Sequence, residues 1–434
     1  MTETVSVIGA GLAGCEAAWQ LAKFGHQVTL YEMKPKKFSA AHRSKNFAEL
    51  VCSNSLKARR LGSAAGMLKE EMRLFGSLIL ECGEKFSVEA GGALAVDREL
   101  FSVQVTRRVC ECEKIKVVNK EVVDIPEGKV IIATGPLTSE PLSKKISDLI
   151  GKNQLYFYDA AAPIVLADSI DMSKAFFGSR YNRGGADYIN CPMDEKEYEN
   201  FYNQLVEGDC ARLHECDKLK VYEGCMPIEE MARRGRDTIR FGPLKPVGIF
   251  HPKTGEKYYA VLQLRKENAE GTMYNMVGFQ TNLKFGEQKR IFSLIPGLEN
   301  AEFLRYGVMH RNTFINSPAL LDSRLRLKKF PNVRFAGQIT GVEGYMESAA
   351  SGIVAGRFLA DELAKNEEGL VLPKTTMIGS LIEYITKSNS SDFQPMGANM
   401  GLVPGLEVKI KDKRQRYETL ARRGLLDLAC ALKN

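Results

Sequence analysis

The sequence predicts an α/β protein whose parallel sheet is interrupted by a smaller α+β insertion. Three observations support this prediction. Short apolar segments typical of buried strands alternate with helical stripes, a glycine-rich turn joins the first strand to the first helix, and a central stretch alternates in steps of two, like an antiparallel strand. At 434 residues the chain is long enough for two or three domains.

Residues 4–33 predict a strand, a tight turn, a helix and a second strand. The segment VSVIGA is apolar and β-branched, alanine and leucine then follow at helical spacing, and QVTLYE alternates. Further buried strands are expected at 129–135 and 332–339, and an alanine-rich helix at 347–363. We expect these elements to form one parallel sheet with helices on both faces.

The middle of the chain has a different pattern. The segment KYYAVLQLRKE alternates apolar and polar residues, as a strand does when one face of its sheet meets water. The composition changes gradually on either side of this region. We therefore predict one discontinuous domain, residues 1–180 and 275–434, interrupted by an insertion domain at 181–274.

Composition argues against several classes of protein. Hydrophobic residues make up 44% and charged residues 26%, as in ordinary globular chains, and the formal charge of +7 suits a polyanionic partner without requiring one. The ten cysteines form no CxxC pair and the five histidines are dispersed, so we expect no metal. The sequence shows neither a secretory leader nor an apolar stretch of membrane-spanning length, so we expect a cytoplasmic protein without a membrane partner.

The glycine-rich turn carries a GxGxxG fingerprint in the context that binds a dinucleotide. It follows a strand, opens a helix, and is followed 18 positions later by Glu32 at the end of the next strand. Gly9 permits the turn, Gly11 lets the backbone approach a pyrophosphate, and Gly14 lets helix and strand pack closely. The helix N-terminus favours the phosphate charge, and Glu32 can accept hydrogen bonds from a ribose. The run comprises Gly9, Ala10, Gly11, Leu12, Ala13 and Gly14.

Two later segments favour FAD over NAD as the bound dinucleotide. VIIATG at 130–135 resembles a strand and turn that recur in flavoproteins with two dinucleotide sites. NVRFAGQITG at 332–341 resembles the segment that reaches the flavin in those proteins. We therefore predict a Rossmann-like FAD-binding domain and expect Gly337, Gln338 and Gly341 to contact the cofactor.

Two cysteines and one histidine lie in segments that are candidates for chemistry. Cys52 stands in ELVCSNS, a polar turn that we expect to cap a following helix, Cys225 stands in EGCMP, and His310 in MHRNT. From spacing alone, each of these residue types is more often buried and structural than reactive. The neighbouring glycine and polar residues favour exposure of the two thiols.

A basic run near the middle of the chain is a candidate contact for nucleic acid. It contains Arg233, Arg234 and Arg236, and the tail after Glu407 is also rich in lysine and arginine. Such a run is usually a solvated surface. Together with the tail it can also follow the phosphates of an RNA.

The motifs together resemble the flavin- and folate-dependent tRNA uracil-5-methyltransferases, the TrmFO family, formerly grouped with the glucose-inhibited division proteins. The resemblance covers nearly the whole chain. Its most specific segments are VIGAGLAGCEAA, ELVCSNSLKA, SRYNRGGADYINCPM, YGVMHRNTFINSP and FAGQITGVEGYMESAASG.

The resemblance implies a cytosolic FAD enzyme that methylates uracil C5 in the T-loop of tRNA. The carbon comes from 5,10-methylenetetrahydrofolate and the reducing equivalents from NADH or NADPH. A thiolate must add to uracil C6, a base must remove the C5 proton, and a hydride from the reduced flavin completes the methyl group. Cys52 and Cys225 match the two functional cysteines of the family and are assigned jointly as nucleophile and acid/base. His310 matches the position that stacks against the folate ring.

The sequence leaves other functions open. The same chemistry can act on a ribosomal RNA uracil, and the related wobble-uridine branch uses the same two cofactors with a partner protein. A flavin-dependent NAD(P)H oxidase would need no RNA. An RNA-binding protein with vestigial cofactor sites would take up no FAD.

Overall fold

The structure of the chain is a computed structural model in which some short segments are not described. For residues 154–160, 182 and 310–312 it describes the backbone alone. The described residues are 5–39, 41–151, 154–160, 162–182, 185–211, 226–252, 254–268, 270–307, 309–366, 369–390 and 393–433.

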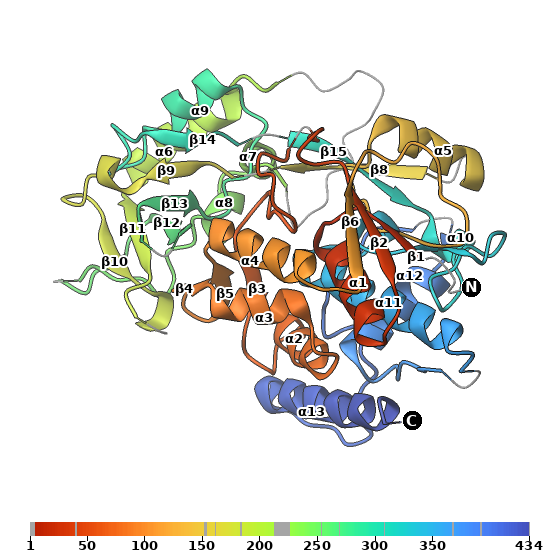
Figure 1. Ribbon diagram of the computed structural model, residues 1–434. Helices are drawn as coiled ribbons and strands as arrows, with labels where there is room; N and C mark the ends of the chain where they lie inside the picture. The colour runs from red at the N-terminus through yellow and green to blue at the C-terminus, as the bar shows by residue number, and fades with distance from the viewer. Residues whose placement is uncertain are drawn as a thin grey trace.

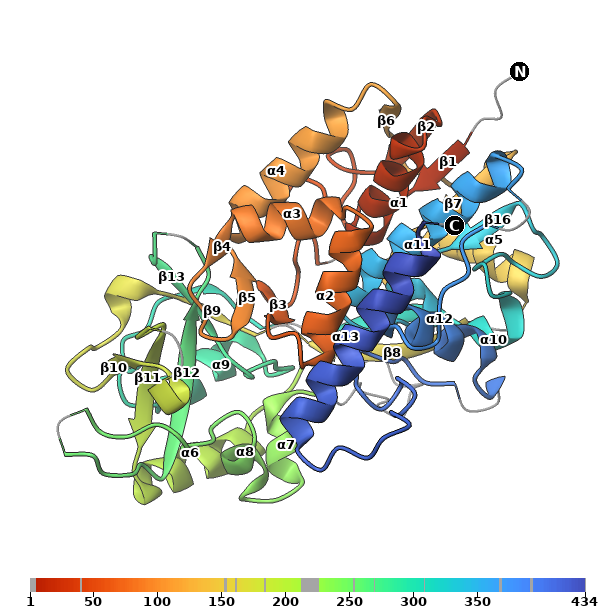
Figure 2. The same cartoon turned by 90° about the horizontal axis from the view of Figure 1, so that it is seen from below.

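Five parallel strands form the sheet of the first lobe, in the order β16–β7–β1–β2–β6. Figure 1 labels β1, β2 and β6 of this sheet, and Figure 2 labels all five strands. The central strand β1 is buried along its whole length, because β-branched and apolar residues occupy both of its faces. This sheet confirms the predicted α/β fold class, and all three predicted strand regions lie in it. The strands are β1 (Val5–Ile8), β2 (Val28–Glu32), β6 (Ile115–Asn119), β7 (Lys129–Ile132) and β16 (Val333–Phe335).

Helices α1 and α11 pack closely against each other beside this sheet. Gly352 of α11 makes the approach possible, since a Cβ atom there would lie 2.2 Å from the carbonyl oxygen of Ala13. α11 begins two residues before the predicted helix. The helices of the first lobe are α1 (Leu12–Lys23), α2 (Ala64–Leu74), α3 (Leu78–Lys85), α4 (Arg98–Cys110), α5 (Glu140–Ile150), α10 (Ser317–Leu320), α11 (Tyr345–Leu363), α12 (Met377–Lys387) and α13 (Lys413–Ala431).

The basic C-terminal tail forms helix α13, which lies along α2 (Figure 2). Gly424 of α13 permits this contact, because a Cβ atom there would lie 2.5 Å from the Cε atom of Met67. A small sheet of β3 (Ser55–Ala58), β5 (Ala93–Val96) and β4 (Ser87–Val88) completes the lobe. Among the described residues, no helix combines the length and apolar character needed to cross a bilayer.

The second lobe, residues 164–305, is built on a six-stranded antiparallel sheet with its own apolar core. Its order is β10–β11–β12–β13–β9–β14. The strands are β9 (Ile164–Leu166), β10 (Phe176–Gly178), β11 (Tyr188–Met193), β12 (Ala260–Lys266), β13 (Met273–Met276) and β14 (Phe303–Arg305). The helices are α6 (Glu195–Glu207), α7 (Ile228–Arg233), α8 (Thr238–Phe241) and α9 (Phe285–Phe292).

The alternating segment KYYAVLQLRKE is confirmed as a strand, but its polar face is buried rather than wet. Arg265 on that face is only 7% exposed, and Glu267 just beyond the strand is 2% exposed. The reason is that this face of β12 meets the first lobe, where Ser53 and Asn54 supply hydrogen-bonding partners.

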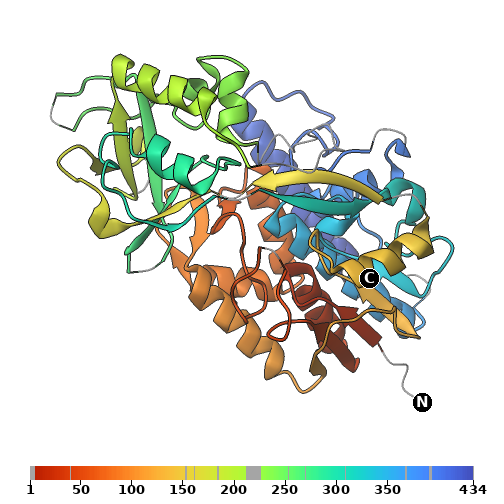
Figure 3. The same cartoon turned by 90° about the horizontal axis from the view of Figure 1, so that it is seen from above.

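A two-stranded ribbon of β8 (Gln154–Ala160) and β15 (Met309–Ile315) connects the lobes (Figure 3). β8 leads into the second lobe and β15 leads back, and the two pair antiparallel along their full length. The domain boundaries at 181 and 274 stay a prediction. The second sheet includes β9 and β10, which precede that range, and β14, which follows it.

The buried Glu71 ties α2 to the start of α12. Its two carboxylate oxygens accept the backbone N–H groups of Met377 at 2.7 Å and Ile378 at 2.8 Å. We expect Glu71→Ala to destabilise the protein by about 2–3 kcal/mol, because two buried donors lose their acceptor. Urea unfolding measures this loss. Glu70→Ala, at an exposed position next in the chain, is the control and should change stability by less than about 0.5 kcal/mol.

Candidate active site

A cleft opens at the carboxyl ends of the parallel strands, where ligands bind in open α/β sheets. It spans about 1230 Å³ of space, part of which is open to solvent, and is lined by the ends of β1, β2 and β7 and the starts of α1 and α11. Most of the predicted cofactor contacts line it together with Cys52. These residues are Gly9, Ala10, Gly11, Leu12, Ala13, Glu32, Gly337 and Gln338.

The three fingerprint glycines have separate structural roles. Gly9 adopts a φ of 96°, and a Cβ atom there would lie 2.8 Å from the carbonyl oxygen of Ala133. A Cβ atom on Gly14 would lie 1.7 Å from the oxygen of Gly9, so this glycine packs against the turn and does not line the cleft. A Cβ atom on Gly11 would meet no atom within 4 Å. Gly11 therefore borders open space at the uncapped start of α1, which fits the close approach of a pyrophosphate.

Glu32 holds the fingerprint turn against the end of β2. Its Oε2 atom accepts the backbone N–H of Ala10 at 2.9 Å, and its Oε1 atom accepts that of Lys34 at 3.0 Å. Each carboxylate oxygen retains a second lone pair. The side chain can therefore still accept a hydrogen bond from a ribose hydroxyl in the cleft.

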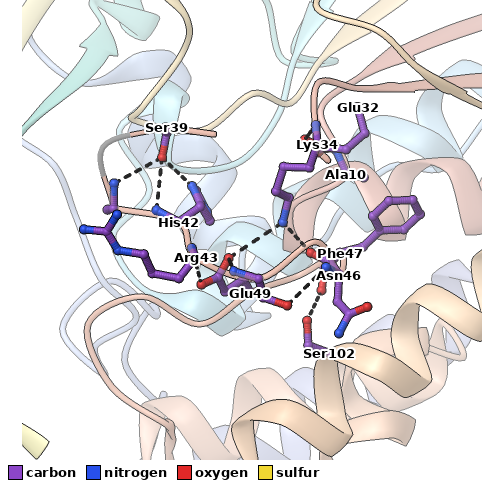
Figure 4. A network of polar contacts seen from close by, with 12 residues as sticks. Ala10, Glu32, Lys34, Ser39, His42, Arg43, Asn46, Phe47, Glu49 and Ser102 are labelled. Carbon is purple, nitrogen blue, oxygen red and sulfur yellow. Dashed lines mark hydrogen bonds and ion pairs between the residues drawn. The ribbon is translucent and has the colours of Figure 1, made fainter. Parts of the chain in front are cut away.

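The loop after β2 forms one wall of the cleft (Figure 4). Glu49 accepts two backbone N–H groups of this loop and lies 3.8 Å from the ammonium group of Lys34. The backbone N–H of Ala48 donates to the carbonyl of Ala10 at 2.9 Å, which ties the loop to the fingerprint. His42 lines the cleft from the same loop.

Cys52 is held by a tyrosine at the first position of α11. The hydroxyl oxygen of Tyr345 accepts the backbone N–H groups of Cys52 at 2.8 Å and Ser53 at 3.3 Å. The same hydroxyl lies 3.0 Å from the Sγ atom of Cys52. Burial raises the pKa of Tyr345 well above its ordinary value, and the charge of Cys52 raises it further. Because both lone pairs of a protonated hydroxyl are then occupied, its proton is directed at the sulfur.

The residues that follow Cys52 are fixed by the second lobe. Arg265 of β12 donates from Nε to the Oδ1 atom of Asn54 at 3.0 Å and from Nη2 to the hydroxyl of Ser53 at 2.8 Å. Asn54 also donates to the carbonyl of Lys266 at 2.9 Å. These cross-lobe bonds explain why the turn leads into strand β3 and does not cap a helix, as the sequence had suggested.

On the other side of Cys52, Arg98 holds the preceding backbone. Its Nη1 atom donates to the carbonyls of Leu50 at 2.7 Å and Val51 at 3.1 Å. Arg98 also pairs with Glu267 of the second lobe. Cys52 therefore stands at the junction of the lobes, with its backbone held from both sides.

Three further predicted site residues stand apart from the cleft or lie wholly or partly outside the description. Gly341 does not line the cleft, and a Cβ atom there would lie 2.5 Å from the Cζ atom of Phe393. Cys225 falls in 212–225, outside the described residues. The backbone of His310 lies on β15 opposite Asp159, and its side chain is outside the description.

The predicted RNA-contacting arginines lie on and just after α7 in the second lobe. Arg233 pairs with Glu230, and Arg236 pairs with Glu199 of α6. Arg234 is exposed. The guanidinium groups of Arg233 and Arg236 therefore each have a carboxylate partner within the protein.

Sequence analysis missed three residues that hold Cys52. Tyr345 could have been identified by its position, directly after the glycine that precedes the helix beyond 332–341. Arg265 lies on the polar face of an alternating strand, and Arg98 begins a helix after an aspartate cap. Neither arginine carries a local pattern that relates it to Cys52.

Comparison with known proteins gives consistent matches. The model of the family described as glucose inhibited division protein A matches residues 4–367. Proteins named methylenetetrahydrofolate–tRNA-(uracil-5-)-methyltransferase TrmFO are similar over nearly their whole lengths. That of Acetivibrio thermocellus is 60% identical and that of Caldicellulosiruptor bescii 59%, each with 97% of both chains covered. That of Staphylococcus aureus is 56% identical, with 98% of both chains covered.

A solved structure supports the fold. GidA of Aquifex aeolicus matches with a TM-score of 0.68 and 18% identity, covering 99% of this chain and 76% of that one. At this identity the similarity concerns the fold alone. The matches at 56–60% identity cover 97–98% of this chain and therefore both of its lobes. The chain therefore belongs to the glucose inhibited division protein A family, in the branch of the TrmFO methyltransferases.

Proposed function

We propose that the protein methylates uracil C5 in the T-loop of tRNA, using 5,10-methylenetetrahydrofolate as carbon donor, FAD as cofactor and NADH or NADPH as reductant. The observation that carries this proposal is the position of Cys52, a thiol in the same cleft as the dinucleotide fingerprint. The names of the relatives at 56–60% identity support the same reaction. Those names do not favour a flavin-dependent oxidase without an RNA substrate.

FAD, when bound and reduced, supplies the hydride that completes the methyl group. The fingerprint turn and the start of α1 hold its pyrophosphate, and Glu32 holds a ribose. Gly337 and Gln338 line the cleft close to Cys52 and Tyr345 and are proposed to contact the flavin. Gly341 is proposed to act indirectly, by shaping the turn that presents them.

Two thiols divide the work on the uracil ring. One thiolate adds to C6, which places an electron pair at C5 for bond formation with the donor carbon. The other group removes the C5 proton while the bond between the methylene carbon and the donor nitrogen breaks, and the nitrogen leaves with the donor. Addition of a hydride to the methylene carbon then gives the methyl group, and the C6–S bond breaks to restore the ring. We assign Cys52 and Cys225 jointly to these two roles. The Tyr345 hydroxyl proton favours the thiolate form of Cys52.

The remaining contacts follow from the family. His310 is proposed to stack against the folate ring, from the ribbon that joins the lobes. Arg233, Arg234 and Arg236 are proposed to contact the tRNA from the second lobe, on and just after α7. The chemistry of a tRNA-modifying enzyme suits a cytoplasmic location.

Transfer of label from 5,10-methylenetetrahydrofolate into RNA tests the proposed function. Unmodified tRNA transcript is incubated with the protein, FAD and NADPH in the absence of S-adenosylmethionine. We expect label in 5-methyluridine of the T-loop. A ribosomal RNA transcript is the control. Label in that transcript but not in tRNA would mean that ribosomal RNA is the methyl acceptor. Oxidation of NADPH without label in either RNA would contradict the proposal.

Tyr345→Phe should slow alkylation of Cys52 by iodoacetamide at pH 7 about tenfold. The substitution removes the hydroxyl that donates to the sulfur, and a hydrogen bond to a charged group contributes about 1.5–3 kcal/mol. Mass spectrometry of the Cys52 peptide measures the rate. Tyr384→Phe, which also removes a tyrosine hydroxyl but at a site bonded to the carbonyl of Gln394, is the control. Equal rates in both variants would mean that the hydroxyl does not act on the thiolate.

A further inference from the structure

A row of three polar side chains and one apolar side chain crosses the second sheet on the face that meets the first lobe. Arg265 pairs in register with Asn275, Asn275 with Ile164, and Ile164 with Arg305, where β14 has a register shift after Phe303. Side chains of residues in direct register lie on the same face of a sheet. Arg265 at one end of the row already bonds Ser53 beside Cys52. The row therefore extends from the thiol to Arg305 at the edge strand β14.

Two groups in this row lack a hydrogen-bonding partner. Asn275 is 3% exposed, and its Nδ2 atom is buried without an acceptor. Among the described residues, none lies within hydrogen-bonding or ion-pairing distance of the guanidinium group of Arg305. Arg305 is partly exposed, so solvent and ligands can reach it. Unsatisfied donors in such a place are suited to an incoming acceptor.

Three guanidinium groups gather around the buried carboxylate of Glu267. Arg98, Arg265 and Arg305 all act on it electrostatically, and Arg98 forms an ion pair with it. Burial lowers the pKa of Arg305, and the charge of Arg98 lowers it further, while Tyr345, Glu267 and Cys52 act in the opposite direction. Positive charges held together in a partly buried site are costly without a counter-ion. An anion bound there would remove that cost.

We propose that Arg305, with the row that leads from it to Arg265, forms an oxyanion-binding site beside Cys52. The site takes one oxyanion of a substrate, either a phosphodiester of the RNA next to the target uridine or a carboxylate of the folate. The planar carboxylate and the tetrahedral phosphodiester each present two oxygens that a guanidinium group can bind. The choice between them rests on the proposed function, whereas the existence of the site does not.

The first experiment tests the site without any methyl transfer. Cys52 is alkylated with iodoacetate, an anion, and with neutral iodoacetamide, and both rates are measured on the Cys52 peptide by mass spectrometry. We expect Arg305→Gln to lower the iodoacetate-to-iodoacetamide rate ratio about three- to tenfold, because one nearby positive charge is lost. Inorganic phosphate should slow the iodoacetate reaction in the unaltered protein and not in this variant.

Two further variants make the result specific. Arg107→Gln, at an exposed position on the far turn of α4, removes the same charge at a distance and should leave the ratio unchanged. Arg305→Lys keeps the charge and should keep most of the ratio. An unchanged ratio in Arg305→Gln, or an equal fall in both glutamine variants, overturns the proposal. If Arg305→Gln does not fold, the lack of any effect of phosphate on the unaltered protein overturns it.

Steady-state kinetics then identify the source of the oxyanion. If the RNA supplies it, Arg305→Gln should raise the KM for tRNA about tenfold and leave the KM for folate unchanged. If folate supplies it, the pattern is reversed. A change in neither KM, with the alkylation ratio lowered, overturns the assignment of the site to a substrate.

Discussion

Cys52→Ala is expected to lower methyl transfer to tRNA by at least about 10³-fold, the size of loss seen when a nucleophile or an essential acid/base is removed. We expect this loss whether Cys52 acts as the nucleophile or as the acid/base, because one turnover needs both roles. Label transfer from 5,10-methylenetetrahydrofolate measures it. The variant should still take up FAD, since the fingerprint and Glu32 are unaltered.

Cys110→Ala provides the matched control for this loss. Cys110 is an exposed thiol at the end of α4, and its substitution should leave label transfer unchanged. A Cys52→Ala protein that retains more than about a tenth of the activity would contradict covalent catalysis by this residue. In that case a non-covalent route for activating the uracil would have to be sought.

Gly11→Ala is expected to weaken FAD binding about a hundredfold while leaving the fold intact. The new methyl group meets no protein atom within 4 Å, so the apoprotein has no clash to relieve. It enters the space that the pyrophosphate needs, and displacement there costs roughly 3 kcal/mol. Flavin fluorescence titration of the apoprotein gives the dissociation constant, and thermal unfolding without FAD checks that stability is unchanged.

Two other glycines make this result interpretable. Gly92→Ala also places its methyl group in open space, but away from the cleft, and should alter neither FAD binding nor stability. Gly14→Ala places a Cβ atom 1.7 Å from the oxygen of Gly9 and should destabilise the apoprotein itself by about 3 kcal/mol. Equal FAD affinity in Gly11→Ala and Gly92→Ala would mean that the pyrophosphate lies elsewhere.

The parts of the fold that sequence could predict are those set by neighbouring residues. The first strand, the fingerprint turn and α1 follow one another between Val5 and Lys23. The strand and the helix are specified by their own periodicity, and the turn by Gly9, whose positive φ other residues rarely adopt. The same holds for α11, where small residues at 352 and 356 meet the backbone of α1. The fold class could therefore be predicted from the sequence alone.

The contacts around Cys52 could not be predicted from the sequence in the same way. Arg265 and Asn54 are 211 positions apart, and nothing in either local pattern identifies the other as a partner. Alternating polar residues along β12 predict that one face of the sheet is exposed to solvent. The local sequence does not show that the first lobe covers this face. Tyr345 differs, since its position at the start of α11 placed it near the cleft even though its bond to Cys52 could not be foreseen.

The ribbon of β8 and β15 has a consequence for how such a protein can change over evolutionary time. The chain leaves for the second lobe and returns from it at adjacent backbone positions, since Val165 and Phe303 are register partners on neighbouring strands. A short hairpin turn spans such a gap. The parts of the lobe away from β12 can thus be enlarged or reduced without moving the strands around the cleft. Arg265 and Glu267 have to stay, because they bond to residues next to Cys52 and to Arg98. Descendants of one scaffold can therefore differ in the outer surface of this lobe and keep the same cleft.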